Sequence, residues 1–294
     1  MDLLVITPFK NEAGSIRLTI ESVLKQDLRP VKWILMDDSS DDESPAIVRS
    51  YQERYPFIHY HQRAKRSVQR ATGNNVVEAF NEGLVLAEQL NIKWDIVCKF
   101  DADLVIDRPD YYAFILGKFE QFPLLGIASG VTYNDVEGKK IIESHHKWHT
   151  QGPNKFYRKA CLEAIGGLRR FKGWDGIDDI LARSRNYITE KFFEQEVLHL
   201  YPTQTRSAEG GFEQGLLREA NGYRNMGYPF YMCAMRSAKL AKERGIYSGW
   251  LFFYYSIKAS IFARPLISDD EVKTVRLFMR KRWKNDFRYT GSTG

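Results

Sequence analysis

Short apolar runs and helical spacings alternate along the first hundred residues of the chain. The apolar runs, which are typical of buried parallel strands, lie at Leu3–Phe9, Val31–Met36, Ile58–His61 and Ile96–Phe100. Between them, apolar positions at helical spacing predict helices at Ser15–Lys25 (with Ser15 as N-cap), Ser44–Tyr55 and Asn74–Leu90. Repeated strand–helix units favour a Rossmann-like α/β fold with a mostly parallel central sheet and helices on both faces. In such sheets, ligands bind at the C-terminal ends of the strands.

The regular alternation ends near residue 125. Shorter strand-like segments, joined by turns that contain Gly and Pro, follow at Ile127–Tyr133, Lys140–Glu143 and Lys155–Tyr157. A helix is predicted from Ile177 to Asn186, and the rest of the chain has a mainly helical pattern. We therefore expect an α/β domain over residues 1–205 and a helical, basic C-terminal extension over residues 206–290.

The positive charge of the chain is concentrated in this extension. Residues 236–288 contain thirteen Lys and Arg against five Asp and Glu, a balance of +8 in a chain of net charge +6. A basic region behind a neutral domain predicts an anionic partner, either membrane lipid or nucleic acid. Within it, the aromatic-rich segment Ser248–Ala263 fits a helix in a membrane interface or a buried helix equally well. No apolar run approaches the roughly 20 residues of a spanning helix, so a soluble or peripheral protein is expected.

The three cysteines, Cys98, Cys161 and Cys233, are far apart and form no CxxC pair. This spacing argues against a disulfide framework or a zinc knuckle and fits a reducing compartment. The chain begins with an apolar strand rather than with a basic segment and a cleavable hydrophobic one. We therefore expect a cytoplasmic protein, peripheral on the inner face of the membrane if the extension binds lipid.

The acidic triplet Asp101-Ala102-Asp103 directly follows the strand Ile96–Phe100. Two carboxylates at this spacing can bind a divalent cation together with a diphosphate, because Mg²⁺ and Mn²⁺ prefer oxygen ligands. The alternative is a solvated acidic turn, since such triplets are common. The preceding strand favours the metal site.

Two more polar segments follow predicted strands. Asp37-Asp38-Ser39-Ser40 can hydrogen-bond a ribose or a base, although capping of the next helix is the commoner role of such residues. The loop Thr7–Glu12 offers Asn11 and Glu12 to the same crevice, and it lacks the glycines of a dinucleotide-binding loop. Taken alone, this second segment is an ordinary strand-to-helix loop.

A further acidic segment, GWDGIDD at residues 173–179, lies at the start of the predicted helix. Asp175 and Asp178 would share one helical face if the helix begins early. Such a carboxylate either complements the helix dipole or acts as a general base that deprotonates an acceptor hydroxyl. The four histidines of this half of the chain are expected to be packed or surface residues: His145, His146, His149 and His199.

In their order along the chain, these segments resemble the family 2 glycosyltransferases of the GT-A fold. VITPFKNE resembles the opening strand of that family, WILMDDSSDDES its strand that ends in two aspartates, and KFDAD its DxD motif. NNVVEAFNEGL resembles the third helix, FYRKACLEAIGG the acceptor-side segment, and GWDGIDD the acidic motif that carries the base. The likeness covers about residues 1–205, and the ordered set is far more specific than any of its members.

The resemblance implies an inverting transfer of a sugar from a nucleotide-diphosphate sugar, with a UDP-sugar favoured, to an acceptor hydroxyl. It implies a divalent ion, Mn²⁺ or Mg²⁺, held by Asp103 with His199 as a second ligand. The implied base is Asp178, with Asp179 as the alternative, because two aspartates replace the usual Glu-Asp pair of the family. The implied donor-binding residues are Pro8, Asn11, Glu12, Asp37, Asp38, Arg66, Arg70, Asp101 and Ala102.

The expected partners are therefore the donor and a glycan or lipid-linked acceptor in cell-surface glycan or polysaccharide biosynthesis, without nucleic acid. A processive synthase is not expected, because Arg282-Trp283 lacks the Gln of a QxxRW motif. One alternative is a nucleotidyltransferase that makes a sugar nucleotide, which the absence of Gly in Thr7–Glu12 disfavours. The other is a non-catalytic protein that binds a sugar or a nucleic acid. The acidic residues at the strand ends disfavour nucleic acid, because they would repel a phosphate backbone.

Overall fold

The computed structural model describes residues 1–64, 74–142, 147–171, 173–201 and 211–283. Its strands are β1 (Leu3–Phe9), β2 (Lys32–Asp37), β3 (Ile58–Gln62), β4 (Ile96–Phe100), β5 (Leu104–Ile106), β6 (Leu125–Val136), β7 (Lys139–Ile142), β8 (Asn154–Arg158) and β9 (Ile188–His199). The helices that accompany these strands are α1 (Ile16–Leu24), α2 (Ser44–Gln52), α3 (Asn74–Gln89), α4 (Tyr111–Gln121), α5 (Lys159–Ile165) and α6 (Trp174–Ser184). The C-terminal helices are α7 (Gly211–Asn225), α8 (Phe230–Arg244), α9 (Ile246–Phe262) and α10 (Asp269–Trp283).

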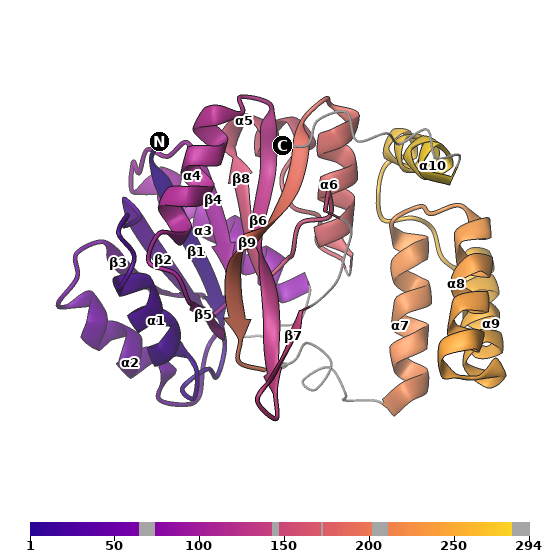
Figure 1. Cartoon of the computed structure of the whole chain (residues 1–294), viewed down its shortest axis with the longest axis horizontal. Coiled ribbons are helices and arrows are strands. Elements are labelled where there is room, and N and C mark those ends of the chain that lie inside the picture. The colour runs from indigo at the N-terminus through magenta and orange to yellow at the C-terminus, as the bar shows by residue number, and fades with distance from the viewer. Residues whose placement is uncertain (65–73, 143–146, 172, 202–210, 284–294) are drawn as a thin grey trace.

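One mixed sheet runs through the larger part of the molecule, with helices on both faces (Figure 1). Its strand order is β3-β2-β1-β4-β8-β6-β9-β5, and β7 pairs with β6 beyond this path. The strands before residue 101 are parallel, as the alternating pattern predicts. In the second half, β8 runs antiparallel to both β4 and β6, whereas β9 is parallel to β6. The α/β class is therefore confirmed, and the sheet becomes mixed because β8 enters it in the reverse direction.

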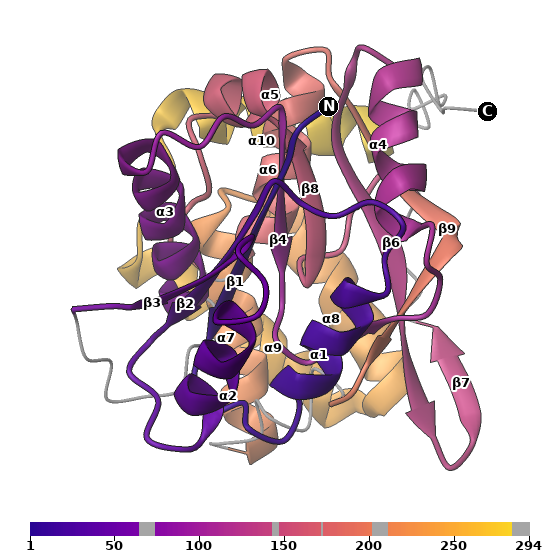
Figure 2. The same cartoon turned by 90° about the vertical axis from the view of Figure 1, so that its left-hand side faces the viewer.

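The alternation of side chains along β1 explains the two helix layers. Leu4 and Ile6 belong to the apolar cluster that includes α3, α5, α6 and α10. Leu3 and Val5 point to the other face, where they pack in the cluster of α1, α2 and α4. Figure 2 shows α3 on one side of these strands and α1 and α4 on the other. A strand that is buried on both faces must be apolar throughout, which is the sequence signal that located it.

Several local features differ from the predictions. Ser15 occupies the N-cap position of α1, but its hydroxyl makes no capping bond and donates to Glu12 instead. The helix predicted from Ile177 begins earlier, at Trp174. The long strand β9 and the three-residue β5 were not predicted, because charged residues interrupt the alternation in β9 and β5 is too short to show a period. These two strands pair antiparallel, with Leu104 opposite His199.

The C-terminal helices form a bundle beside the sheet, and α10 connects it to α6 (Figure 1). Leu240 and Phe252 are buried in the apolar cluster between α7, α8 and α9. Val275 and Phe278 of α10 join the core cluster of the sheet. The predicted boundary near residue 205 falls among residues 202–210, outside the described part, and stays a prediction. In the described ranges, no helix combines the length and apolar character needed to cross a bilayer.

Candidate active site

The loops after β1 and β2 are joined by hydrogen bonds. The N–H of Asn11 donates to Ser40 Oγ (3.0 Å), and the N–H of Asp41 donates to Asn11 Oδ1 (2.8 Å). Asn11 has φ 55°, a left-handed conformation that Asn adopts more readily than most residues. Pro8 and Glu12, which flank this turn, therefore lie along the same edge of the sheet as the aspartates at the C-terminal end of β2.

Asp37 and Asp38 are buried and already have partners within the protein. Asp37 Oδ1 accepts hydrogen bonds from the N–H and the hydroxyl of Ser40, and Oδ2 accepts one from Tyr60 (2.7 Å). Asp38 Oδ1 pairs with Arg63 Nη1 (2.5 Å), and burial raises the pKa of Asp38 despite this partner. Asp38 Oδ2 has no hydrogen-bond partner in the described ranges. Asp37 thus shapes the loop, while Asp38 keeps one oxygen with capacity to accept a further hydrogen bond.

Asp101, Ala102 and Asp103 form the turn between β4 and β5. Asp101 is ion-paired with Lys99, the penultimate residue of β4. The carbonyl of Asp103 accepts a hydrogen bond (3.0 Å) from the backbone N–H of the residue after His199. As a result, His199 Nε2 lies 3.5 Å from Asp103 Oδ2. The pairing of β5 with β9 therefore brings the two predicted metal ligands together from distant parts of the chain.

Asp178 and Asp179 lie near the start of α6, and both carboxyls are buried. Asp178 Oδ1 accepts a hydrogen bond from Lys155 Nζ (2.7 Å), and Oδ2 accepts one from the Tyr157 hydroxyl (2.5 Å). Asp179 Oδ2 lies 2.9 Å from His149 Nδ1. The N–H and the hydroxyl of the threonine after His149 also donate to Asp179, at 2.9 Å and 2.7 Å. Lys155 Nζ also lies 3.2 Å from Asp179 Oδ1, so the two carboxylates share this ammonium and differ in their other donors.

The pKa values of these two neighbours move in opposite directions. Burial raises the pKa of Asp178 to about 6, although the Lys155 ammonium and the Tyr157 hydroxyl favour its ionised form. Burial also acts to raise the pKa of Asp179, but the Lys155 ammonium and the hydrogen bond with His149 outweigh it and hold that pKa below the ordinary value. Asp178 is therefore the member of the pair whose protonation changes near neutral pH.

Two lysines in neighbouring strands connect the acidic groups. Lys99 on β4 and Lys155 on β8 are direct partners in the antiparallel ladder. Lys99 pairs with Asp101, whereas Lys155 pairs with Asp178. The ring of Trp174 lies near both ammonium groups, with Nζ 5.2 Å and 5.9 Å from its centroid. The turn after β4 and the start of α6 therefore belong to one connected polar cluster.

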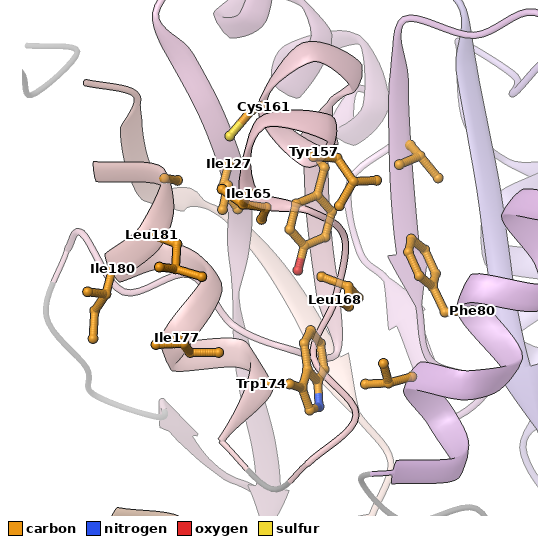
Figure 3. Packing of buried hydrophobic residues seen from close by; sticks show 14 of the residues in the cluster. Phe80, Ile127, Tyr157, Cys161, Ile165, Leu168, Trp174, Ile177, Ile180 and Leu181 are labelled. Carbon is orange, nitrogen blue, oxygen red and sulfur yellow. The ribbon is translucent and has the colours of Figure 1, made fainter. Parts of the chain in front are cut away.

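Apolar side chains shield the inner side of this cluster. Figure 3 shows the Tyr157 hydroxyl pointing toward Trp174, with Leu168 and Phe80 packed nearby. Water is excluded from this side of Asp178, and that exclusion is the desolvation that raises its pKa. Asp175, in the first turn of α6, is only partly buried and marks the side open to solvent.

The sequence patterns did not indicate the groups that hold these carboxylates: Arg63, Lys99, Thr150, Lys155 and Tyr157. A usable signal was the lysine inside each of the apolar strand sequences VCKF and NKFY, because a buried ammonium requires a carboxylate partner. His149 was expected to be an ordinary packed histidine, and the structure places it against Asp179. Four residues named above lie outside the described part of the chain: Arg66, Arg70, His145 and His146.

The side chains at the turn after β4 are suitable ligands for a divalent cation. Asp103 and His199 supply a carboxylate oxygen and an imidazole nitrogen whose separation of 3.5 Å suits two ligands of one ion. The described residues contain no cluster of three or more His, Cys, Asp or Glu arranged for a metal. Mg²⁺ and Mn²⁺ sites commonly use one or two protein ligands and complete the shell with phosphate oxygens and water. A site of this kind would need further oxygen ligands, from a bound phosphate group or from water.

Similar folds occur among solved glycosyltransferases. They include the mannosyltransferase PcManGT from Pyrobaculum calidifontis in complex with GDP-Man and Mn²⁺ (TM-score 0.58, 16% identity, 97% of this chain and 81% of that chain). They also include S. aureus TarS 1–349 in complex with UDP-GlcNAc (TM-score 0.56, 15% identity, 97% of this chain and 79% of that chain). A third is GalNAc-T7 with UDP, GalNAc and Mn²⁺ (TM-score 0.59, 10% identity, 89% of this chain and 57% of that chain).

Sequence comparison supplies the family. No match was found among curated proteins. The model of the family described as glycosyl transferase family 2 matches residues 4–171, which is more than half of the chain. The structural likenesses agree with this match and confirm the predicted GT-A fold. On these grounds the chain belongs to glycosyl transferase family 2 and is a glycosyltransferase.

Proposed function

We propose that this glycosyltransferase moves a sugar from a nucleotide-diphosphate sugar to an acceptor hydroxyl, with inversion at the anomeric carbon. One observation carries the proposal. Asp178, a buried carboxyl whose pKa is raised to about 6, is connected through the paired Lys155 and Lys99 to the turn that carries Asp101 and Asp103. A candidate base and a candidate metal site thus share one edge of the sheet, as a displacement between two bound substrates requires.

The donor would lie against the turn after β4 and the loops after β1 and β2. Asp38 Oδ2 is available to accept a hydrogen bond from the nucleoside. Asp103 and His199 would hold Mn²⁺ or Mg²⁺, which when bound neutralises charge on the leaving diphosphate. Similar structures were obtained with GDP-Man and with UDP-GlcNAc, so donors of both kinds are candidates, with UDP-sugars first.

Asp178 is proposed as the base. As the acceptor oxygen forms a bond to the sugar C1, the bond from C1 to the diphosphate oxygen breaks and Asp178 takes the acceptor proton. Attack opposite the leaving group inverts the anomeric centre. Asp178 is only 2% exposed, so the acceptor hydroxyl must displace one of its present donors, Lys155 or Tyr157. Asp179, whose pKa is held below the ordinary value by Lys155 and His149, is proposed as a positioning residue that fixes the loop around His149.

Three isosteric variants on the same helix test the base. Asp178→Asn should lower kcat by roughly 10²–10⁴, the range for a lost general base, without changing nucleotide affinity measured by calorimetry. Asp175→Asn is the matched control, because it alters a partly exposed carboxylate in the same helix and should leave kcat within a few-fold. Asp179→Asn should weaken activity less than Asp178→Asn. Weaker nucleotide binding with unchanged turnover in Asp178→Asn would contradict the assignment, and a loss confined to Asp175→Asn would move the base to that residue.

The proposed acceptor is a hydroxyl of a glycan or a lipid-linked saccharide, in cell-surface glycan or polysaccharide synthesis. Membership of a glycosyltransferase family removes the support for a nucleotidyltransferase or a non-catalytic binding protein. A donor screen with UDP- and GDP-sugars distinguishes these reactions by their products. Release of a nucleoside diphosphate supports sugar transfer, whereas release of pyrophosphate from a nucleoside triphosphate would contradict it. Proton NMR of the new glycosidic bond then reports whether the anomeric configuration is inverted.

A further inference from the structure

One face of α9 presents large apolar side chains to solvent. We call this the α9 face; it consists of Ile246, Tyr247, Trp250, Tyr254, Ile257 and Ile261, all of which are exposed. Ile246 is 83% and Trp250 61% exposed, and the Trp250 and Tyr254 rings stack with centroids 5.8 Å apart. Spacings of three and four residues place these side chains along one stripe of the helix. A contiguous stripe of this kind differs from the scattered apolar residues that are normal on protein surfaces.

The opposite side of α9 is fixed by close packing on α7 and α8. Leu251 and Phe252 are buried in the cluster shared by these three helices. Gly249 allows the close approach, because a Cβ at this position would lie 2.5 Å from the carbonyl oxygen of Ser237. The helix therefore cannot turn its apolar stripe inward without losing this packing. The exposure of the α9 face is a consequence of how the bundle is built.

Basic residues border the α9 face. Lys258 is exposed on the flank of the stripe, and Arg264 follows its C-terminal end. Lys242 and Arg244 precede the helix and are also exposed. Over residues 230–283 there are eleven Lys and Arg against four Asp and Glu. An apolar stripe with a basic border is complementary to a surface that is negatively charged outside and apolar within.

A pocket of about 290 Å³ adjoins this face. Its lining includes Arg224, Arg276, Phe230 and Ser260, and Ser260 is a surface neighbour of Ile257 at the i,i+3 spacing. Arg224 Nε donates a hydrogen bond to the backbone carbonyl of residue 263 (2.9 Å), and Arg276 Nε donates one to the backbone carbonyl of residue 227 (3.4 Å). In the described ranges neither guanidinium has a carboxylate partner within 4.0 Å. The pocket therefore offers two cations, next to the apolar stripe, to a small anionic group.

We propose that the α9 face and this arginine-lined pocket dock the protein onto a bilayer that contains anionic phospholipid. The aromatic and aliphatic side chains enter the boundary between headgroups and acyl chains, where amphipathic aromatic rings are favoured. The basic border is attracted by the negative surface, and a headgroup phosphate binds between Arg224 and Arg276. A second copy of the chain is a less suitable occupant. If two α9 faces packed together, their basic borders would lie close to each other and repel. Docking is independent of the transfer reaction, so either proposal can fail alone.

Co-sedimentation of the full chain with vesicles of phosphatidylcholine, with and without phosphatidylglycerol, tests the docking. Binding is expected only with phosphatidylglycerol, and it should fall as salt is added. The triple variant Trp250→Ser/Tyr254→Ser/Ile261→Ser should bind roughly tenfold more weakly or worse. Lys258→Ala should lower affinity by about fivefold at low salt, the effect of one basic residue near an anionic surface. Arg276→Gln, in the pocket, should reduce the preference for phosphatidylglycerol.

Matched controls come from the sheet domain, where Val85 and Leu124 are also exposed. Val85→Ser and Leu124→Ser should leave vesicle binding unchanged. Phospholipids with brominated acyl chains should quench part of the tryptophan emission of the wild type, and Trp250→Phe should abolish that part. Thermal unfolding by circular dichroism checks that each variant is folded. Absence of binding at low salt, equal binding by the triple variant, or a dimer in sedimentation velocity that Trp250→Ser dissociates would each overturn the proposal.

Discussion

Replacing Tyr157 by Phe removes a single hydroxyl that donates to Asp178 Oδ2 at 2.5 Å in a fully buried site. The aromatic ring is retained, so the apolar packing around Trp174 is largely preserved. The expected effect is electrostatic: the ionised form of Asp178 loses one of the donors that oppose the effect of burial. The pKa of Asp178 should therefore rise further above about 6.

The size of the shift follows from the hydrogen bond that is lost. A hydrogen bond to a charged group contributes about 1.5–3 kcal/mol, and one pKa unit corresponds to about 1.4 kcal/mol. The acid limb of kcat/KM, which reports the free enzyme, should accordingly move up by roughly one to two pH units. Because the folded pKa of Asp178 lies above its unfolded value, this group stabilises the fold at acid pH and loses that contribution as pH rises through about 6. The loss of unfolding free energy in Tyr157→Phe should thus be about 1.5–3 kcal/mol at pH 8 and clearly smaller near pH 5.

Two measurements check this prediction: pH–rate profiles of kcat/KM and urea unfolding at several pH values. Tyr112→Phe is the matched control, because Tyr112 is fully buried and its hydroxyl has no hydrogen-bond partner in the described ranges. That variant should change neither the acid limb nor the pH dependence of stability. If Tyr157→Phe left the acid limb in place and destabilised the protein equally at both pH values, the assigned electrostatic role of Tyr157 would be refuted.

Three further predictions concern other parts of the molecule. His199→Ala should weaken Mn²⁺ binding in the presence of nucleotide at least about tenfold in calorimetry, and unchanged binding would remove His199 from the proposed metal site. Arg63→Met leaves Asp38 buried without its cation, so urea unfolding should show a loss of about 3–5 kcal/mol; a smaller loss would mean that water reaches this carboxyl. Gly249→Ala places a Cβ 2.5 Å from the carbonyl oxygen of Ser237, which should destabilise the C-terminal bundle by about 1–3 kcal/mol in thermal unfolding while nucleotide binding is unchanged.

The sequence by itself determined the parallel half of the fold. Strands such as Leu3–Phe9 are buried on both faces and are therefore apolar throughout, so their positions are visible without any tertiary information. The acidic triplet was identified because it directly follows the apolar strand β4. The segment GWDGIDD was identified because it lies at the start of a predicted helix, α6. The order of these segments also predicted the family, which the comparisons confirm.

Only the tertiary structure decided which of these residues meet. Asp103 and His199 come together because β5 pairs with β9, and neither spacing nor composition encodes that register. Asp178 and Asp179 are identical neighbours in the sequence and share Lys155, yet their pKa values diverge. Their other partners differ, because β8 supplies a tyrosine to Asp178 and the loop before β8 supplies a histidine and a threonine to Asp179. Likewise, the apolar segment around Trp250 was compatible with a buried or an exposed helix. Its packing on α7 and α8 buries one side and leaves the other in solvent, since a helix can press only part of its surface against its neighbours.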